Sequence, residues 1–64
     1  MQSALAELSS VASQLEEITK RVVDAARTYE AGGREGVSHE LFEVERSLRA
    51  AARRLERATR DAQR

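Results

Sequence analysis

The sequence contains no cysteine and no proline, and it has a single histidine, tyrosine and phenylalanine. Without cysteine there are no disulfide bonds and no thiolate metal ligands, and one histidine does not make a zinc site. A chain of 64 residues buries a small fraction of its surface alone, and disulfides, a metal or oligomerisation are the usual remedies. We therefore predict no cofactor and no metal, and stabilisation by oligomerisation.

The chain has no net charge, because eleven basic residues balance eleven acidic residues. This balance argues against a protein whose whole surface attracts nucleic acid or anionic lipid. No apolar run approaches the ~20 residues of a membrane span, and residues 1–7 lack the basic start and apolar core of a signal peptide. We expect a cytoplasmic protein that does not bind membranes. Ten of the eleven basic residues are arginine and asparagine is absent, a composition that we interpret as that of a GC-rich bacterial genome.

Glycine occurs only within residues 32–36, between two long segments that have a helical repeat. Glycine supplies the left-handed backbone that ends many helices, so we expect this conformation at Gly32 or Gly33. Ser38 is a candidate N-cap for the second helix, with Val37 and Phe42 at the two positions of a hydrophobic staple. We predict one domain, residues 1–64, with a helix at about 3–31, a turn at 32–37 and a helix at about 38–62.

The first segment follows a heptad repeat, abcdefg, in which Leu5 occupies position a. The a and d positions are Leu5, Leu8, Ala12, Leu15, Thr19, Val22, Ala26 and Tyr29, and the apolar g positions are Ala4, Val11, Ile18 and Ala25. Three apolar positions in seven form a surface wide enough for two neighbouring helices, whereas a two-stranded coiled coil needs only a and d. For Thr19 we expect a hydroxyl bonded to the carbonyl of the preceding turn, with a register-fixing role as the alternative.

The second segment has a matching repeat. Its apolar positions are Leu41, Val44, Leu48, Ala51, Leu55, Ala58 and Ala62. Because the turn is short, the two helices should pack antiparallel. The expected fold class is all-α: an antiparallel helical hairpin that dimerises into a four-helix bundle of the coiled-coil type. The candidate self-association face comprises Leu8, Val11, Leu15, Ile18, Val22, Leu48 and Leu55.

Six arginines in the second helix recur at spacings of three and four residues, which places them on one side of the helix. This arginine row consists of Arg46, Arg49, Arg53, Arg57, Arg60 and Arg64. In one interpretation the row is solvated and balanced by Glu7, Glu16 or Glu17 of the packed helix. In the other it docks an anionic partner, either an acidic protein surface or nucleic-acid phosphates. No aromatic residue that could stack on bases lies in the row, which favours a protein partner.

No enzyme motif is present: the glycine stretch lacks the spacing of a phosphate loop, and no nucleophile pairs with His39. We predict no catalytic, cofactor-binding or metal-binding residues. The expected function is that of a non-catalytic interaction or regulatory module, which forms a homodimer and binds a partner protein through its helix faces. In length and topology alone, such a hairpin resembles Rop, a plasmid RNA-binding regulator, and the resemblance implies an alternative function in nucleic-acid binding. A coiled-coil subunit of a larger hetero-oligomeric assembly is a further alternative.

Overall fold

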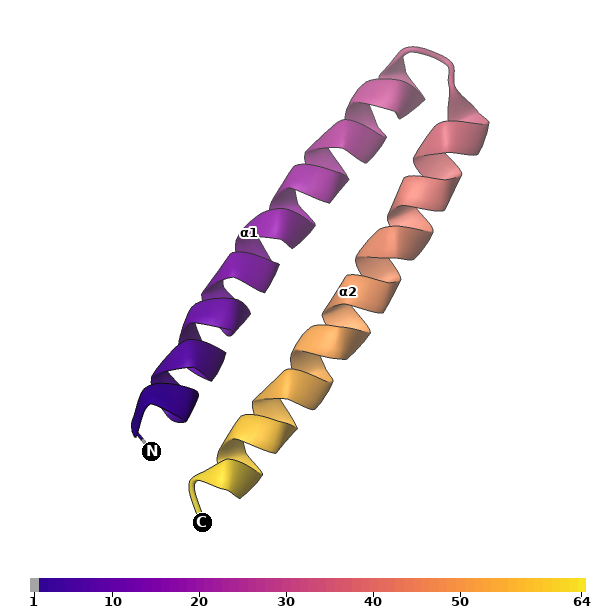
Figure 1. The fold of residues 1–64 in the computed structure, drawn as a ribbon. Coiled ribbons are helices and arrows are strands. Elements are labelled where there is room, and N and C mark those ends of the chain that lie inside the picture. Colours follow the sequence, from indigo (N-terminus) through magenta and orange to yellow (C-terminus); the bar gives the residue numbers. More distant parts are fainter. Residues whose placement is uncertain (1) are drawn as a thin grey trace.

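Two long antiparallel helices joined by a tight turn make up the fold (Figure 1). The computed structural model describes residues 2–64, with side chains from Ser3 onward. Helix α1 comprises Gln2–Ala31 and helix α2 comprises Glu35–Ala62. Both ends of the described chain lie at the end of the molecule opposite the turn. The expectation of an all-α helical hairpin is confirmed.

The turn is a Schellman motif built around one left-handed glycine. Gly33 has a φ of 80°, its N–H donates to the carbonyl of Glu30 (3.1 Å), and the N–H of Arg34 donates to the carbonyl of Tyr29 (2.8 Å). These two hydrogen bonds satisfy carbonyls that the end of a helix leaves without partners. The left-handed glycine expected in this stretch is therefore at Gly33.

Helix α2 begins three residues earlier than predicted, and Ser38 is not its N-cap. The N-cap position is Arg34, whose side chain makes no capping hydrogen bond; its carbonyl accepts from the N–H of Ser38 (3.0 Å). The Ser38 hydroxyl donates to the carbonyl of Glu35 (3.0 Å). Because Val37 and Phe42 both lie inside α2, the hydrophobic staple is also wrong. The chain reverses over residues 32–34, with Gly33 at positive φ. The helix therefore restarts at Glu35, whose negative charge suits a helix N-terminus.

Apart from Glu45 on α2, small residues form the contact line between the two helices. On α1, Thr19 and Ala26 are buried, and on α2, Ser38 is buried, with Ala52 and Thr59 half-buried farther along. The hydroxyl of Thr19 donates to the carbonyl of Leu15 (2.7 Å), which confirms the expected local hydrogen bond. The hydroxyl of Thr59 donates to the carbonyl of Leu55 (2.8 Å) in the same way. Because these buried hydroxyls are satisfied within their own helices, they need no partner across the interface.

The side of α2 that faces α1 differs from the side marked by its strongest apolar repeat. Val44 is 43% exposed, and Ala51 and Ala58 are also exposed, whereas Glu45 and Ala52 are half-buried. Leu41, Leu48 and Leu55 are half-buried, because they lie between these two rows. The contact line of α2 thus follows Ser38, Glu45, Ala52 and Thr59, and the predicted apolar positions lie to one side of it.

The hairpin buries little of its apolar surface. Ala26 is the one buried hydrophobic residue in the described part of the chain, and the accessible surface is 5162 Å². The scaling for compact monomers of 7.1 kDa gives about 4,100 Å². The radius of gyration is 14.8 Å, against about 11 Å for a compact domain of this length. Neither described helix combines the length and the apolar character that crossing a bilayer requires.

Candidate functional site

The hairpin has two different sides, one apolar and one polar. The apolar face consists of Leu8, Val11, Leu15, Ile18, Val22 and Ala25 on α1, and Leu41, Val44, Leu48, Ala51, Leu55 and Ala58 on α2. Residues at spacings of three and four share one side of a helix. Both helices contribute to this face, because a shallow hollow on it is lined by Ile18, Val22 and Ala25 of α1 and Leu41 of α2, with Arg21 of α1 at its border. All seven residues of the predicted self-association face lie on it.

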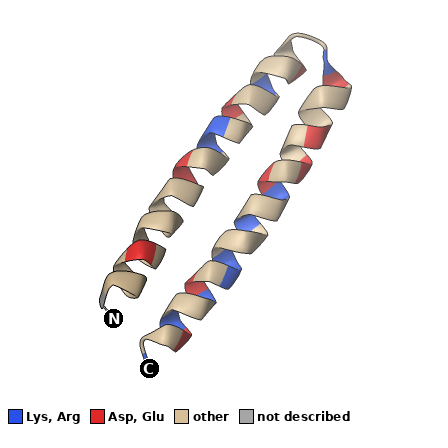
Figure 2. Ribbon diagram, viewed as in Figure 1, with Lys and Arg blue, Asp and Glu red and all other residues tan. Residues whose placement is uncertain are grey.

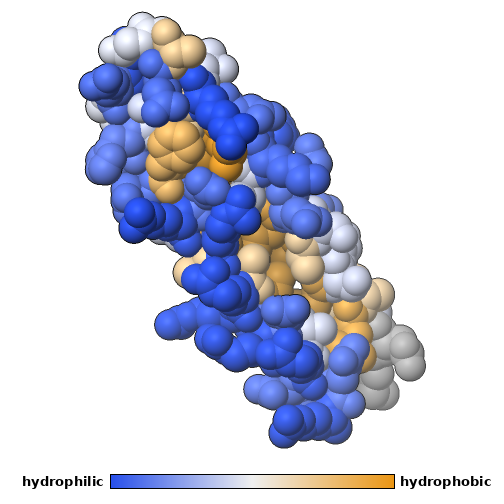
Figure 3. Space-filling model, turned by 180° about the vertical axis from the view of Figure 1, so that it is seen from behind, coloured by the Kyte–Doolittle hydropathy of each residue, from blue (hydrophilic) through white to orange (hydrophobic). Residues whose placement is uncertain are grey.

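Exposure on the apolar face increases with distance from the contact line. Ala26 on that line is completely buried, and Leu15 and Val22 in the next row are half-buried. In the outermost rows, Val11 is 39% exposed and Ile18 is 45% exposed. The branched side chains of Val11, Ile18 and Val44 therefore remain accessible on this face. On the side seen in Figure 3, hydrophobic residues form an interrupted band between hydrophilic side chains.

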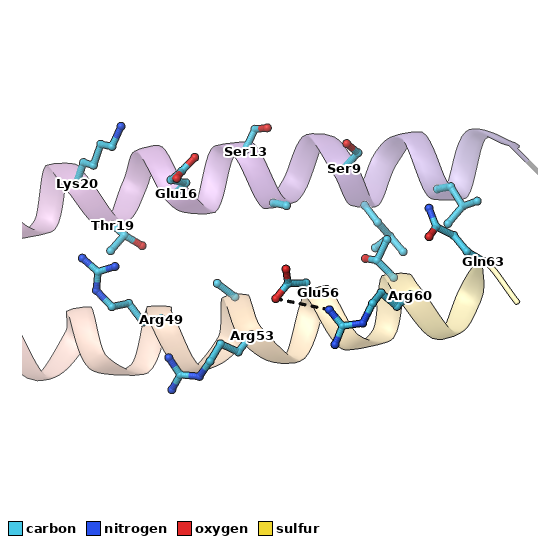
Figure 4. Close-up of a pocket in the computed structure, with 15 residues that line it drawn as sticks. Ser9, Ser13, Glu16, Thr19, Lys20, Arg49, Arg53, Glu56, Arg60 and Gln63 are labelled. Atoms are coloured by element: carbon cyan, nitrogen blue, oxygen red, sulfur yellow. Dashed lines mark ion pairs between the residues drawn. The ribbon is translucent and has the colours of Figure 1, made fainter.

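The polar groove is a long open hollow between α1 and α2. The α1 wall comprises Ser9, Ser13, Glu16 and Lys20, the floor comprises Leu5, Leu8, Ala12 and Ala52, and the α2 wall comprises Arg49, Arg53, Glu56 and Arg60. These residues occupy mainly heptad positions on the other side of the contact line from the apolar face, and Leu8 borders both. In Figure 4, Thr19 points from α1 toward α2 and Arg49 extends from α2 toward α1. The volume of the groove is about 700 Å³.

The structure divides the predicted arginine row into two groups. Arg49, Arg53 and Arg60 line the polar groove, whereas Arg46, Arg57 and Arg64 do not. The difference arises because the row is wider than the groove. A step of three residues turns back by about 60° around the helix and a step of four turns forward by about 40°, so Arg46, Arg57 and Arg64 lie farther around α2 than the other three. The six arginines are therefore not one binding surface, and only the first group borders a hollow.

Ion pairs in the described part of the chain form within α2. Arg49 Nε lies 2.8 Å from Glu45 Oε2, and Arg60 Nη1 lies 3.8 Å from Glu56 Oε1, the pair drawn as a dashed line in Figure 4. Arg46 pairs with Glu43 at 3.8 Å. None of these pairs joins α2 to α1, so Glu7, Glu16 and Glu17 do not form the ion pairs that one interpretation assigned to them. Exposed pairs of this kind contribute only about 0–1 kcal/mol each.

Some features of the site were missed in the sequence. The acidic partners Glu45 and Glu56 were visible as residues four positions before an arginine, a spacing that favours pairing on a helix. The contact between Arg34 and Tyr29, with the guanidinium carbon 5.9 Å from the ring centroid, could not be expected once the helix start was misplaced. Figure 2 shows the basic residues of α2 concentrated in its C-terminal half and most of its acidic residues, Glu35, Glu40, Glu43 and Glu45, nearer the turn. This uneven distribution of charge along α2 affects which orientation of two paired copies is favoured.

Comparison with known proteins found no matching family model, no matching curated protein and no matching solved structure.

Proposed function

We propose that this chain is a non-catalytic interaction module that forms an antiparallel homodimeric four-helix bundle through its apolar face and binds a partner protein through its other helix faces. The observation that supports the proposal best is the position of the large apolar residues. Val11, Ile18 and Val44 are exposed, while small residues occupy the contact line within the hairpin. A second hairpin would supply the neighbours that these side chains lack.

The amount of exposed surface fits an association of this size. The accessible surface of 5162 Å² exceeds that of a compact monomer of equal mass by roughly 1,000 Å². A typical stable interface buries about 800 Å² on each partner. Burial of apolar surface is the main source of favourable free energy in such association. Covering the apolar face would bring this chain close to the surface area of an ordinary folded protein.

The charges beside the apolar face of α2 favour an antiparallel arrangement of two copies. Glu40 lies four residues before Val44, and Arg54 lies between Ala51 and Ala58 on the helix surface. If the two α2 helices pair antiparallel around Ser47, Glu40 of each copy faces Arg54 of the other. The same register places Val44 of one copy at the level of Ala50 of the other. A parallel arrangement would put like charges opposite each other, which disfavours it.

Oligomeric state tests this proposal. The dimer should have twice the monomer mass by sedimentation equilibrium, and its melting temperature should rise with protein concentration. Ile18 and Leu48 are equally distant from Gly33 in the chain, so Ile18 lies at the level of the proposed two-fold axis. Ile18→Glu would therefore place two carboxylates close together in the dimer and should abolish association.

Ser10→Glu is the matched control, because Ser10 is exposed and lies off the apolar face. It should leave the mass and the concentration dependence unchanged. A monomer mass for the unmodified chain, with a melting temperature independent of concentration, would contradict self-association.

A further inference from the structure

We infer that the polar groove binds an acidic amphipathic helix, which packs its apolar side on the groove floor and places carboxylates beside the arginines of α2. This inference deepens the proposed function, on which it rests, by naming the face that the partner contacts and the chemistry of that partner. Recognition of a helix in a groove relies on an apolar side of the ligand and on charges at its borders. The polar groove has an apolar floor and charged borders, and it lies on the side of the hairpin away from the apolar face.

The dimensions of the groove suit a helix of about four turns. The α1 residues that line it extend from Leu5 to Lys20, a rise of about 22 Å at 1.5 Å per residue. The floor offers Leu5, Ala12 and Ala52 as apolar contacts. Ser9 and Ser13 form a low wall on α1, since their side chains are short, and this leaves room for a third helix beside the two of the hairpin.

The charges of the groove select an acidic ligand. Four cationic side chains, Lys20, Arg49, Arg53 and Arg60, border it against two carboxylates, Glu16 and Glu56. None of the ion pairs among the described residues includes Arg53. Arg60 is held only by an exposed contact of 3.8 Å to Glu56. Arg53 and Arg60 are seven residues apart, so they lie two turns apart on one side of α2 and match carboxylates at the same interval on a bound helix.

A protein helix fits these features better than nucleic acid does. Glu16 and Glu56 would repel phosphates that followed the groove, and neither tyrosine nor phenylalanine lines it to stack on bases. A second copy of this chain can occupy the apolar face at the same time, because the two faces share only Leu8 and otherwise lie on opposite sides of the contact line. The partner in the groove is therefore a different helix from the one that completes the bundle.

Binding of a defined peptide tests the inference. The probe is a fluorescein-labelled helical peptide of about 16 residues, long enough for the groove at 1.5 Å per residue, with alanine and leucine on one side and glutamates along its borders. The unmodified protein should bind it saturably in fluorescence anisotropy. A peptide of the same length with lysine in place of every glutamate should not bind.

Charge reversal on α2 identifies the surface that binds. Arg53→Glu should weaken binding of the acidic peptide about tenfold, because it turns an attraction into a repulsion at the groove wall. Arg57→Glu changes the net charge equally on the same helix outside the groove, and binding should stay within about twofold. Both sites are exposed, so both variants should keep the circular dichroism of the parent.

A steric pair of variants gives an independent measure. Ser13→Trp fills the groove and should abolish peptide binding, whereas Ser10→Trp on the outer side of α1 should not.

Equal binding of the lysine peptide, equal loss in Arg57→Glu, or displacement of the acidic peptide by polyuridylate would each overturn the inference. The mass of the unmodified protein, measured in the same samples, tests the dimer separately. If the protein is a dimer but does not bind the peptide, only the inference about the polar groove is contradicted. If it is a monomer that binds the peptide, only the proposed dimer is contradicted.

Discussion

At the scale of single residues, the turn depends on one backbone conformation and one side-chain contact. Gly33 occupies the left-handed region, where an L-residue with a side chain is strained. Schellman motifs usually place an apolar residue after the glycine, against a residue in the last turn of the helix. Arg34 stands there instead, and its guanidinium covers the Tyr29 ring at 5.9 Å. The flat, weakly hydrated guanidinium can stack on an aromatic ring in place of an apolar side chain.

Gly33→Val should lower the free energy of unfolding by about 1–2 kcal/mol, because a β-branched residue is strained at positive φ. Chemical denaturation measures the change. Gly36→Ala is the control: Gly36 lies in α2, nothing lies within 4 Å of an added Cβ, and alanine is the better helix former by about 1 kcal/mol. A neutral Gly33→Val variant would show that the chain reverses elsewhere.

At the scale of the helices, much of the fold could be predicted and the rotation of α2 could not. The glycines at residues 32–36 marked the turn, and the heptad repeat from Leu5 marked α1 because the buried Thr19 and Ala26 fall on its a positions. On α2 the same reasoning from the apolar repeat indicated Val44 and Ala51 as residues that face α1, but both are exposed. An apolar repeat shows on which side of a helix the apolar residues lie, but it does not show which neighbouring helix that side contacts. Here small residues face the near helix and large ones lie to one side.

Two adjacent alanines of α2 test this rotation. Ala52→Leu should destabilise the hairpin by about 1–3 kcal/mol, because a larger side chain on a close contact line overpacks it. At protein concentrations too low for the proposed association, Ala51→Leu adds the same atoms on the exposed apolar face and should not destabilise. Thermal or urea denaturation of the two variants compares them directly. The opposite order would mean that α2 meets α1 through its strongest apolar repeat.

At the scale of the whole molecule, the hairpin is a rod with extents of 48 × 15 × 9 Å along its principal axes. Two helices side by side are too thin to bury all of the apolar side chains that they carry. The residues of the proposed self-association face could be chosen from the sequence because they are large and periodic. The polar groove could not, because it forms between serines of α1 and arginines of α2 that are distant in the chain. The arginine row appeared continuous in the sequence, whereas the fold assigns its members to different surroundings.

The proposed dimer makes a prediction about crosslinking. The chain has no cysteine, and Ser47 lies at the centre of the proposed antiparallel pair of α2 helices. Ser47→Cys should therefore give a disulfide-linked dimer under mild oxidation, since the two Cα atoms should lie within the ~7 Å that a disulfide requires. Non-reducing gel electrophoresis measures the yield. Ser10→Cys should remain uncrosslinked, and equal yields from both variants would exclude the proposed register.

The line of small residues between α1 and α2 has a mechanical consequence. The interaxial distance of two packed helices follows from the side chains at their contact, within a range of about 8–10 Å. In this hairpin that one distance determines the width of the polar groove and the width of the apolar face together. A substitution at Ala26, which is completely buried and belongs to neither surface, would widen or narrow both. The proposed ligand binding on one side and the proposed association on the other would thus be connected through the spacing of two helices.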